Sequence, residues 1–308
     1  MPLMPFVLPD EIPSRFAPGR RPRLPEDIGP AERIAANSLS PQMRRVIGWL
    51  SMGGVWSAAQ LGVPLRTLQR WAQMGVIQRL PFSTGQVAET LTRYGYPLDG
   101  RKRSQITLYR LGSVGEVLAK HLYPMTPLHT PDYSLERLMH DFFTNEIVLR
   151  LAILGREQGW GVWWAGTNAA ELRKGSEQIL EPDALLVFRR DDGERVYAVE
   201  YHGERGTRRA RDKVRRYERA YSMDDLWESI WETETFPAVL AVFHDPAVGR
   251  GYKESLTQKR SNVRFYGKLL RSLFEGKVGT WKRIDTGTRE NLLLLSEEEL
   301  SQEEVQHA

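Results

Sequence analysis

The sequence of 308 residues contains no cysteine. Disulfide bonds and cysteine-ligated zinc are therefore excluded, and any bound metal must be held by oxygen atoms or imidazole. No apolar run approaches the length of a membrane span, and the first ten residues lack the basic segment that precedes the apolar core of a secretory signal. We therefore expect a cytoplasmic protein that makes no membrane contact.

The charge is small in total but uneven along the chain. The net charge is +4, yet residues 1–130 hold 16 Lys and Arg against 8 Asp and Glu. The remainder is slightly acidic, and the tail 296–308 carries five acidic residues and no Lys or Arg. The composition is 41% hydrophobic and 27% charged, as in an ordinary globular chain long enough for two domains. The N-terminal part is thus the better candidate to bind a polyanion.

Residues 1–38 are rich in proline and arginine and have few apolar residues in register. We expect an extended arm here, either a disordered leader or a segment that follows a DNA backbone. From Leu39 the pattern becomes helical. Ser40-Pro41 provides a cap and a first-turn proline, and Gly53-Gly54 ends the helix.

The next segment, 56–71, has the spacing of a helix-turn-helix, with small residues at Ala58 and Gly62 where two helices cross. The second helix, about 64–74, would be the recognition helix, with Leu65, Leu68 and Trp71 facing inward. Four outward side chains are of types that contact base edges and phosphates in a major groove: Arg66, Thr67, Gln69 and Arg70.

Two β-prone segments, 76–80 and 106–110, are expected to form a wing, followed by a closing helix at 111–122. The insertion between the strands carries a basic run, Arg101-Lys102-Arg103. The sequence therefore predicts a winged helix-turn-helix domain over 39–123 that binds DNA. A small helical bundle, or a winged module that contacts only protein, is the alternative interpretation.

Three prolines at positions 124, 127 and 131 indicate a linker. A helix capped by Ser134 is expected from Leu135 to Gln158, followed by a strand at 159–164 and a polar loop at 167–179. Further on we expect a buried strand at 238–243, a helix at 262–275 and a last strand at 278–284.

A β-hairpin is predicted between these elements. Two apolar, β-prone runs, 184–188 and 196–199, flank an Asp-Asp-Gly turn at 191–193. Because side chains alternate along a strand, Glu200 shares a face with His202. Asp183 opens the partner strand, so pairing would bring its carboxylate beside that of Glu200. Two carboxylates from adjacent strands are the usual protein share of a Mg²⁺ site, which predicts Mg²⁺ or Mn²⁺ here.

The hairpin is followed by a helix from Arg208 to Tyr221 that is dense in Arg and Lys. Arg209, Lys213 and Tyr217 fall at helical spacing on one side. A cation on this side could reach back toward the carboxylate pair.

Together, Pro182-Asp183, the hairpin, Glu200 and the basic helix resemble the PD-(D/E)XK nuclease superfamily. More narrowly, Glu200-x-x followed by Lys213-x-x-x-Tyr217 resembles the replication-relaxation family, the plasmid mobilisation accessory proteins. A motif upstream, His140-x-x-x-x-Asn145, adds to this likeness, which covers about 133–243. The resemblance implies an α+β chain in which the winged helix domain is followed by an α/β restriction-endonuclease-like domain over 133–290.

The resemblance also implies roles for particular residues. Asp183 and Glu200 would hold the metal, with Glu146 from the first core helix, or Glu181, as a further ligand. The last position of the nuclease motif is His202 rather than Lys, and the resemblance implies that Lys213 takes the place of that lysine. Lys213 or His202 would then orient the attacking water or neutralise a phosphate oxygen.

The expected function is that of a DNA-binding protein of a mobile element, with other replication, mobilisation or transposition proteins as partners. It is either a Mg²⁺-dependent endodeoxyribonuclease or a non-catalytic accessory that uses the nuclease fold as a scaffold. Two further alternatives stay open. One is the endonuclease subunit of a heteromeric transposase, and the other is a factor that acts through protein partners by its acidic tail and by exposed Trp227 and Trp231.

Overall fold

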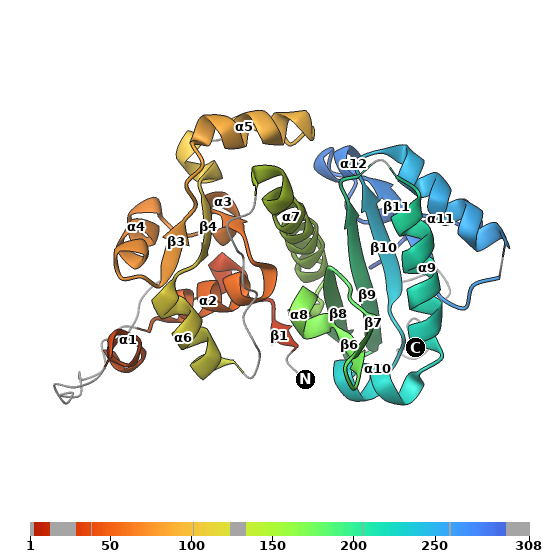
Figure 1. Ribbon diagram of the computed structural model, residues 1–308, viewed down its shortest axis with the longest axis horizontal. Coiled ribbons are helices and arrows are strands. Elements are labelled where there is room, and N and C mark those ends of the chain that lie inside the picture. Colours follow the sequence, from red (N-terminus) through yellow and green to blue (C-terminus); the bar gives the residue numbers. More distant parts are fainter. Residues whose placement is uncertain are drawn as a thin grey trace, which may run out of the picture.

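The chain is a mixed α+β protein whose centre is an eight-stranded sheet (Figure 1). The computed structural model describes residues 3–12, 29–37, 39–100, 102–123, 134–204, 206–258 and 260–293. A module from about the first two fifths of the chain lies on one side and the large sheet lies on the other. One long helix, α7 (Leu135–Glu157), stands between them. Within the described ranges, no helix has both the length and the apolar character needed to cross a membrane.

The N-terminal module packs short helices around a small antiparallel sheet of order β2-β4-β3. In chain order it contains α2 (Pro41–Gly53), β2 (Trp56–Ser57), α3 (Ala58–Leu61), α4 (Leu65–Gln73), β3 (Ile77–Arg79), α5 (Thr84–Arg93), a 3-10 turn (Arg103–Ile106), β4 (Leu108–Leu111) and α6 (Ser113–Leu122). Ser40 caps α2 by accepting a 3.1 Å hydrogen bond from Met43 N, and Gly54 ends it at φ 67°, as predicted. Leu65 was predicted to face inward but is 36% exposed, because it opens α4 at the surface.

The large sheet has the order β1-β5-β8-β9-β10-β11-β12-β13. Its strands are β1 (Met4–Pro5), β5 (Gly161–Gly166), β8 (Ala184–Arg190), β9 (Gly193–His202), β10 (Ala238–Phe243), β11 (Phe265–Leu269), β12 (Thr280–Arg283) and β13 (Arg289–Asn291). Strands β9, β10 and β11 run parallel, and the other neighbours are antiparallel. The β8–β9 hairpin is confirmed, and Arg190 and Gly193 are the last pair of its ladder before the turn.

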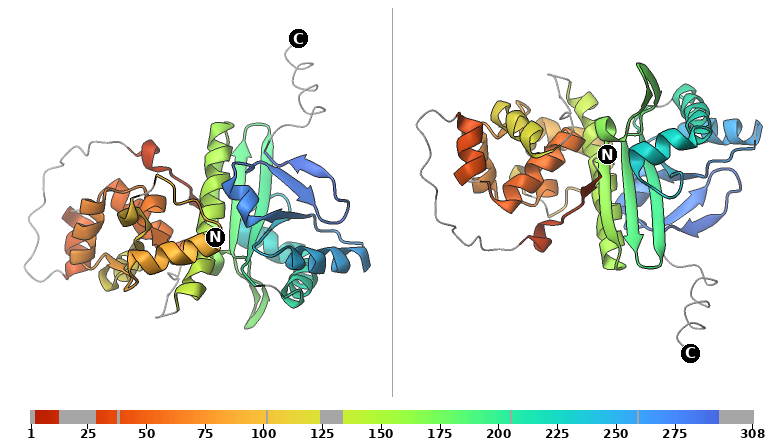
Figure 2. Two further views of the ribbon diagram at one scale, coloured as in Figure 1. Left: turned by 90° about the horizontal axis from the view of Figure 1, so that it is seen from above. Right: turned by 90° about the horizontal axis from the view of Figure 1, so that it is seen from below.

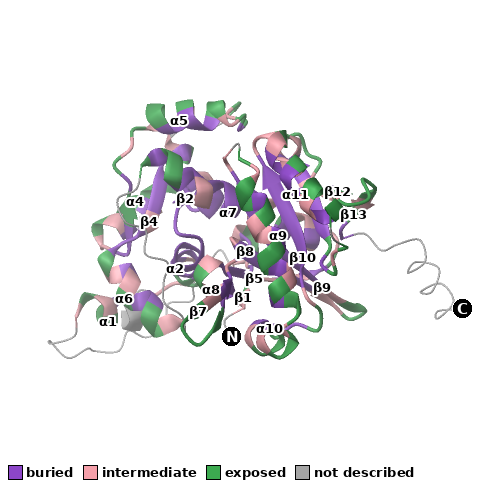
Figure 3. Cartoon of the chain, turned by 45° about the vertical axis from the view of Figure 1, so that its right-hand side comes forward, coloured by how far each residue is buried: buried purple, intermediate pink, exposed green. Residues whose placement is uncertain are grey.

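Helices cover both faces of this sheet (Figure 2). They are α7 (Leu135–Glu157), α8 (Thr167–Ala170), α9 (Arg208–Tyr221), α10 (Asp224–Trp231), α11 (Pro246–Gln258) and α12 (Leu270–Phe274). Along β9, Val199 and Tyr201 belong to the core layer with α7, whereas Val196 and Ala198 belong to the layer with α9, α10 and α11. This is the alternation expected of a strand buried on both faces. Figure 3 shows these buried strands lying between helices whose outer surfaces are exposed.

The N-terminal module and the large sheet share one hydrophobic core. The ring of Trp56 lies 4.6 Å from that of Trp49 in α2 and 5.9 Å from that of Trp164 in β5, measured between centroids. Asn145 of α7 is 1% exposed and donates 2.8 Å hydrogen bonds to the carbonyls of Gly53 and Val55. The predicted linker, 124–131, and the predicted acidic tail, 296–308, lie outside the described residues.

The N-terminal residues that are described do not form the predicted arm. Strand β1 pairs with β5 at the sheet edge, where Pro5 needs no ladder donor. Phe6 follows it and is fully buried, 4.7 Å from the ring of Trp49. A further helix, α1 (Pro30–Asn37), buries Ile34. The few apolar residues of this segment are therefore enough to attach it to the core.

Three predictions for the second half of the chain are wrong. The segment 167–179 is not a polar loop but contains α8 and a hairpin of β6 (Leu172–Lys174) and β7 (Glu177–Leu180). The segment 262–275 is strand β11 followed by α12, because its aromatic start pairs beside β10, and helix α11 before it was not predicted. Trp227 and Trp231 are 6% and 0% exposed, so they offer no contact surface.

Candidate functional site

Glu200 lies at the centre of a buried polar cluster. It is 1% exposed near the end of β9, and both of its carboxylate oxygens face α9 partners. The Tyr217 hydroxyl donates a 2.7 Å hydrogen bond to Oε1, and Lys213 Nζ lies 2.6 Å from Oε2. Lys213 and Tyr217 are four residues apart, so they project from the same side of the helix. Lys213 Nζ also donates to the carbonyl of Glu181 at 2.8 Å.

Burial and charge act together in this cluster. Burial raises the pKa of Glu200 above its ordinary value, and the charge of Lys213 opposes that shift. Burial lowers the pKa of Lys213, but the carboxylates of Glu200 and Asp183 more than compensate, so the net shift is upward. The pKa of Tyr217 is raised well above its usual range, first by burial and then by the charge of Glu200. Tyr217 therefore stays protonated and donates its hydrogen bond.

Asp183 lies opposite Glu200, as predicted from the hairpin. The pairing of Ala184 with Val199 places it there, just before β8. Its Oδ2 accepts a 2.7 Å hydrogen bond from the Tyr201 amide and lies 3.3 Å from His140 Nε2 on α7. Burial alone would raise the pKa of Asp183, but His140 and Lys213 hold it well below its usual range. The carboxylate is therefore ionised and bound to internal partners.

A cavity of about 640 Å³ opens at this point between α7 and the ends of β8 and β9. Asp183 and His140 line it with Asp141, Glu181 and Glu204. Burial lowers the pKa of His140, but the carboxylates of Asp183 and Asp141 raise it well above its ordinary value. Glu200 is not among the lining residues. Of the two acids predicted to form the site, Asp183 therefore lines the cavity and Glu200 does not.

Glu146 and His202 are not brought to this cavity. Glu146 is 4% exposed, and its carboxylate accepts hydrogen bonds from Arg150 of the same helix at 2.8 Å and from Gln60 of α3 at 3.1 Å. His202 is 3% exposed, with Nδ1 2.9 Å from Glu204 Oε1 and Nε2 2.8 Å from the hydroxyl of Tyr252. The structure therefore does not support a metal-ligand role for Glu146 or a water-orienting role for His202.

The arrangement does not fit the predicted Mg²⁺ or Mn²⁺ site. Both oxygens of Glu200 contact Tyr217 or Lys213, and Asp183 is paired with His140. Among the residues that the structure describes, no three His, Asp or Glu side chains lie close enough together to hold a metal ion. Lys213 would compete with a metal ion for the Glu200 carboxylate. The resemblance implies a catalytic role for this same lysine.

The predicted DNA-binding residues lie on the N-terminal module. Arg66, Gln69 and Arg70 of α4 are exposed, and Thr67 is half-buried. Lys102 is exposed, whereas Arg101 and the side chain of Arg103 lie outside the described part of the chain. Helix α4 bears no acidic residue, and within the described ranges neither Arg66 nor Arg70 has an ion-pair partner.

Comparisons with known proteins add no relative. No protein-family model, no curated protein and no solved structure matches the chain. The family resemblance drawn from the sequence therefore stays a prediction.

The partners of His202 and Asp183 were not all foreseen from the sequence. Tyr252 comes from α11, a helix that was not predicted, and Glu204 lies only two residues beyond His202. Asp141 follows His140 directly, so the adjacent pair was visible as a possible polar cluster. The contacts of His202 with Glu204 and Tyr252 have no sequence spacing that signals them.

The ion pair between His140 and Asp183 should make stability depend on pH. Since the pKa of His140 is raised in the folded state, its stabilisation is complete below the ordinary value of 6.5 and is lost as the pH rises through the folded-state value. We expect the difference in unfolding free energy between wild type and His140→Gln to be larger at about pH 6 than at about pH 9. Urea denaturation of both proteins at each pH measures this difference in unfolding free energy. A difference that stays constant or grows with pH would contradict the pairing.

Proposed function

We propose that the chain is a DNA-binding protein of the replication or mobilisation type, which contacts duplex DNA through its N-terminal module. In this proposal the module is a winged helix-turn-helix, with α3 and α4 as the two crossing helices and β3 and β4 as the wing. The observation that carries the proposal is the outer face of α4. It combines exposed Arg66, Gln69 and Arg70, has no acidic residue, and buries Leu68 and Trp71 on its inner side.

The larger domain is a nuclease-like scaffold in this proposal. The order of α7, β5, β8, β9, α9 and β10, with β9 and β10 parallel, is that expected of a PD-(D/E)XK core. The pairing of Glu200 with Lys213 and Tyr217, and of Asp183 with His140, supports a structural role for these acids. The domain would then position the N-terminal module and bind the other proteins of the system.

Replacing Arg66 and Arg70 together by alanine tests DNA binding. We expect the affinity for duplex DNA to fall about tenfold or more, because arginines that reach bases or phosphates each contribute on the order of 1 to 3 kcal/mol. Fluorescence anisotropy over a range of salt concentrations measures both affinity and its salt dependence. The matched control is Arg208→Ala with Arg216→Ala, two exposed arginines of α9. Equal losses in both double variants would contradict recognition by α4.

An endonuclease is the second candidate, favoured by the convergence of Asp183, Glu200 and Lys213 at the open end of the hairpin. Such an enzyme would need Glu200 released from Lys213. Incubating the wild type with supercoiled and single-stranded DNA and Mg²⁺ or Mn²⁺ separates the two candidates. We expect no cleavage. Cleavage that Asp183→Asn abolishes, with DNA binding retained, would establish the enzyme instead.

A further inference from the structure

The N-terminal module buries an arginine that has no acidic partner. Arg45 of α2 is 6% exposed, and within the described ranges no carboxylate is paired with its guanidinium. Burial lowers its pKa to about 10, so the side chain keeps its charge at neutral pH. Two of its nitrogens, Nε and Nη1, are buried without a hydrogen-bond partner in the part of the chain that the structure describes. An unpaired charge of this kind is costly to bury.

The third nitrogen of Arg45 holds the end of α3. Nη2 donates a 2.5 Å hydrogen bond to the carbonyl of Leu61, the last residue of that helix. Helix α3 has four residues, so its last carbonyls find no partner within the helix. The guanidinium also lies 4.4 Å from the ring centroid of Trp49, one turn further along α2. Arg45 therefore ties α2 to the end of the first of the two helices proposed to cross.

The chain turns toward α4 directly after this carbonyl. Gly62 adopts a left-handed conformation, with φ 61°, and α4 begins three residues later at Leu65. The N-terminal segment packs against the turn, because a methyl group added at Gly62 would collide with the ring of Pro9. Within α4 the first buried side chain is Leu68, whereas Leu65 is 36% exposed. The direction in which α4 starts therefore depends on the turn.

Stability alone does not account for the guanidinium of Arg45. A methionine side chain of similar length would fill the same space and leave no buried charge, and replacing buried charges by apolar groups is often neutral or stabilising. Methionine, however, has no donor for the carbonyl of Leu61, whereas a charged donor makes a stronger hydrogen bond than a neutral one. What Arg45 supplies and an apolar side chain cannot supply is the attachment of the turn.

We propose that Arg45 is a positioning residue for DNA binding. By holding the carbonyl of Leu61 it fixes the α3–α4 turn, and with it the angle at which α4 presents Arg66 and Arg70 to duplex DNA. Arg45 is itself too deeply buried to contact DNA. The inference rests on the proposed function, because it assumes that α4 contacts the duplex. It adds that the affinity depends on a side chain outside the contact face.

Replacing Arg45 by methionine tests the proposal. We expect the affinity for labelled duplex DNA, measured well below the melting temperature, to fall about tenfold, as for the loss of one base contact. The melting temperature should change by no more than a few degrees. Arg45→Lys should recover most of the affinity, since an ammonium group can also donate to the carbonyl. Unchanged duplex affinity in Arg45→Met would overturn the proposal. A large fall in its melting temperature would also overturn it, by showing that the side chain acts through stability.

Amide hydrogen exchange measures the turn without DNA. Peptides that cover residues 60–68 should exchange faster in Arg45→Met than in the wild type, because a turn that has lost its attachment opens more often. In Arg45→Lys the same peptides should exchange at about the wild-type rate. Exchange at the wild-type rate in Arg45→Met would show that Arg45 does not hold the turn, and the proposal would be wrong.

A combined variant separates this proposal from the proposed function. In a protein that already carries Arg66→Ala and Arg70→Ala, adding Arg45→Met should lower duplex affinity by less than about twofold, because the contacts that it misplaces are already gone. A further loss as large as in the wild-type background would overturn the positioning role and leave the proposed function intact. If Arg66→Ala with Arg70→Ala keeps the wild-type affinity, both the proposed function and this inference fail.

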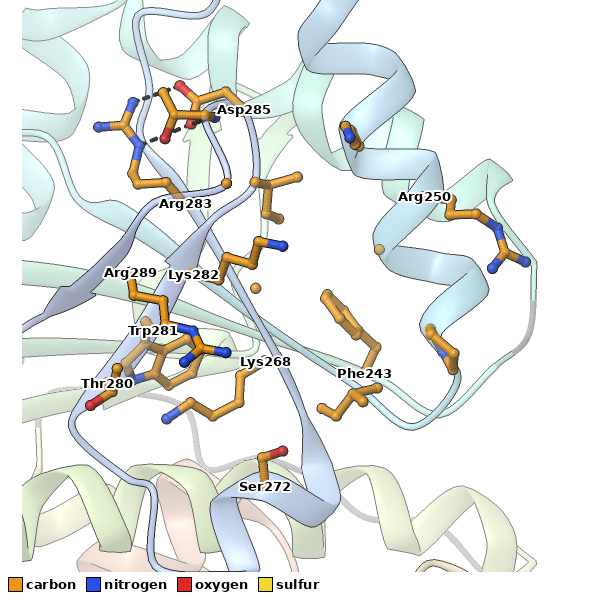
Figure 4. A pocket seen from close by; sticks show the side chains of 18 of the residues that line it. Phe243, Arg250, Lys268, Ser272, Thr280, Trp281, Lys282, Arg283, Asp285 and Arg289 are labelled. Carbon is orange, nitrogen blue, oxygen red and sulfur yellow. Dashed lines mark hydrogen bonds and ion pairs between the residues drawn. The ribbon is translucent and has the colours of Figure 1, made fainter.

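The matched control is Arg289→Met. It removes an exposed arginine from the β12–β13 hairpin, where Figure 4 shows the side chain beside a pocket of the large sheet. Duplex affinity should stay at the wild-type value in this variant, because Arg289 does not contact the α3–α4 turn. A loss equal to that in Arg45→Met would show a general effect of charge and would overturn the proposal.

Discussion

Replacing Lys213 by alanine is expected to lower the free energy of unfolding by about 3 to 5 kcal/mol. The change removes the only cation that the structure places within 4.0 Å of the Glu200 carboxylate among the described residues. Glu200 is 1% exposed, so its carboxylate loses the charge that offsets its burial. The carboxylate must then either remain charged beside the Tyr217 hydroxyl or take up a proton, and both outcomes cost free energy.

Urea denaturation of three variants separates the ion pair from a general effect of the substitution. Arg216→Ala is the matched control on the same helix, where an exposed side chain should change stability by less than about 0.5 kcal/mol. Adding Glu200→Gln to Lys213→Ala should restore part of the stability, because a neutral amide is less costly to bury than an unpaired carboxylate. If Lys213→Ala were no more destabilising than Arg216→Ala, the cluster would not be a buried ion pair.

The hairpin and its polar cluster were predictable because the signals are local. The turn at 191–193 fixes the register, and the register alone places Asp183 opposite Glu200. The spacing of Lys213 and Tyr217 then places both on the side of α9 that meets Glu200. Sequence reasoning was therefore able to predict which of these groups meet.

The partner that each polar side chain contacts was not predictable, because it depends on packing between elements far apart in the sequence. The position of His202 in the sequence does not reveal that its Nε2 is hydrogen-bonded to the hydroxyl of Tyr252, fifty residues further on. Glu146 faces the N-terminal module because Gln60 reaches it from α3, eighty-six residues away. The segment 262–275 was misread because its apolar residues fit a helical period, whereas its start is a strand that pairs with β10.

Replacing Trp164 by alanine is expected to lower the free energy of unfolding by about 3 to 5 kcal/mol and to destabilise both halves of the molecule together. Trp164 is fully buried in β5, and its ring lies 5.9 Å from that of Trp56 in the N-terminal module and 5.4 Å from that of Phe6. Its removal leaves a cavity where the module meets the sheet, and close-packed neighbours fill such a space only in part.

Two probes of unfolding decide whether the shared core makes the protein one cooperative unit. Far-UV circular dichroism follows the whole chain, and binding of labelled duplex DNA follows the N-terminal module, so both transitions should shift to lower urea by the same amount in Trp164→Ala. Trp163→Ala is the matched control: the neighbouring side chain points to the other layer and is only half-buried, so its loss should cost less. A shift confined to one probe would show that the module and the sheet unfold independently. The rings of Trp49, Trp56 and Trp164 would then make a contact between two domains and not a common core.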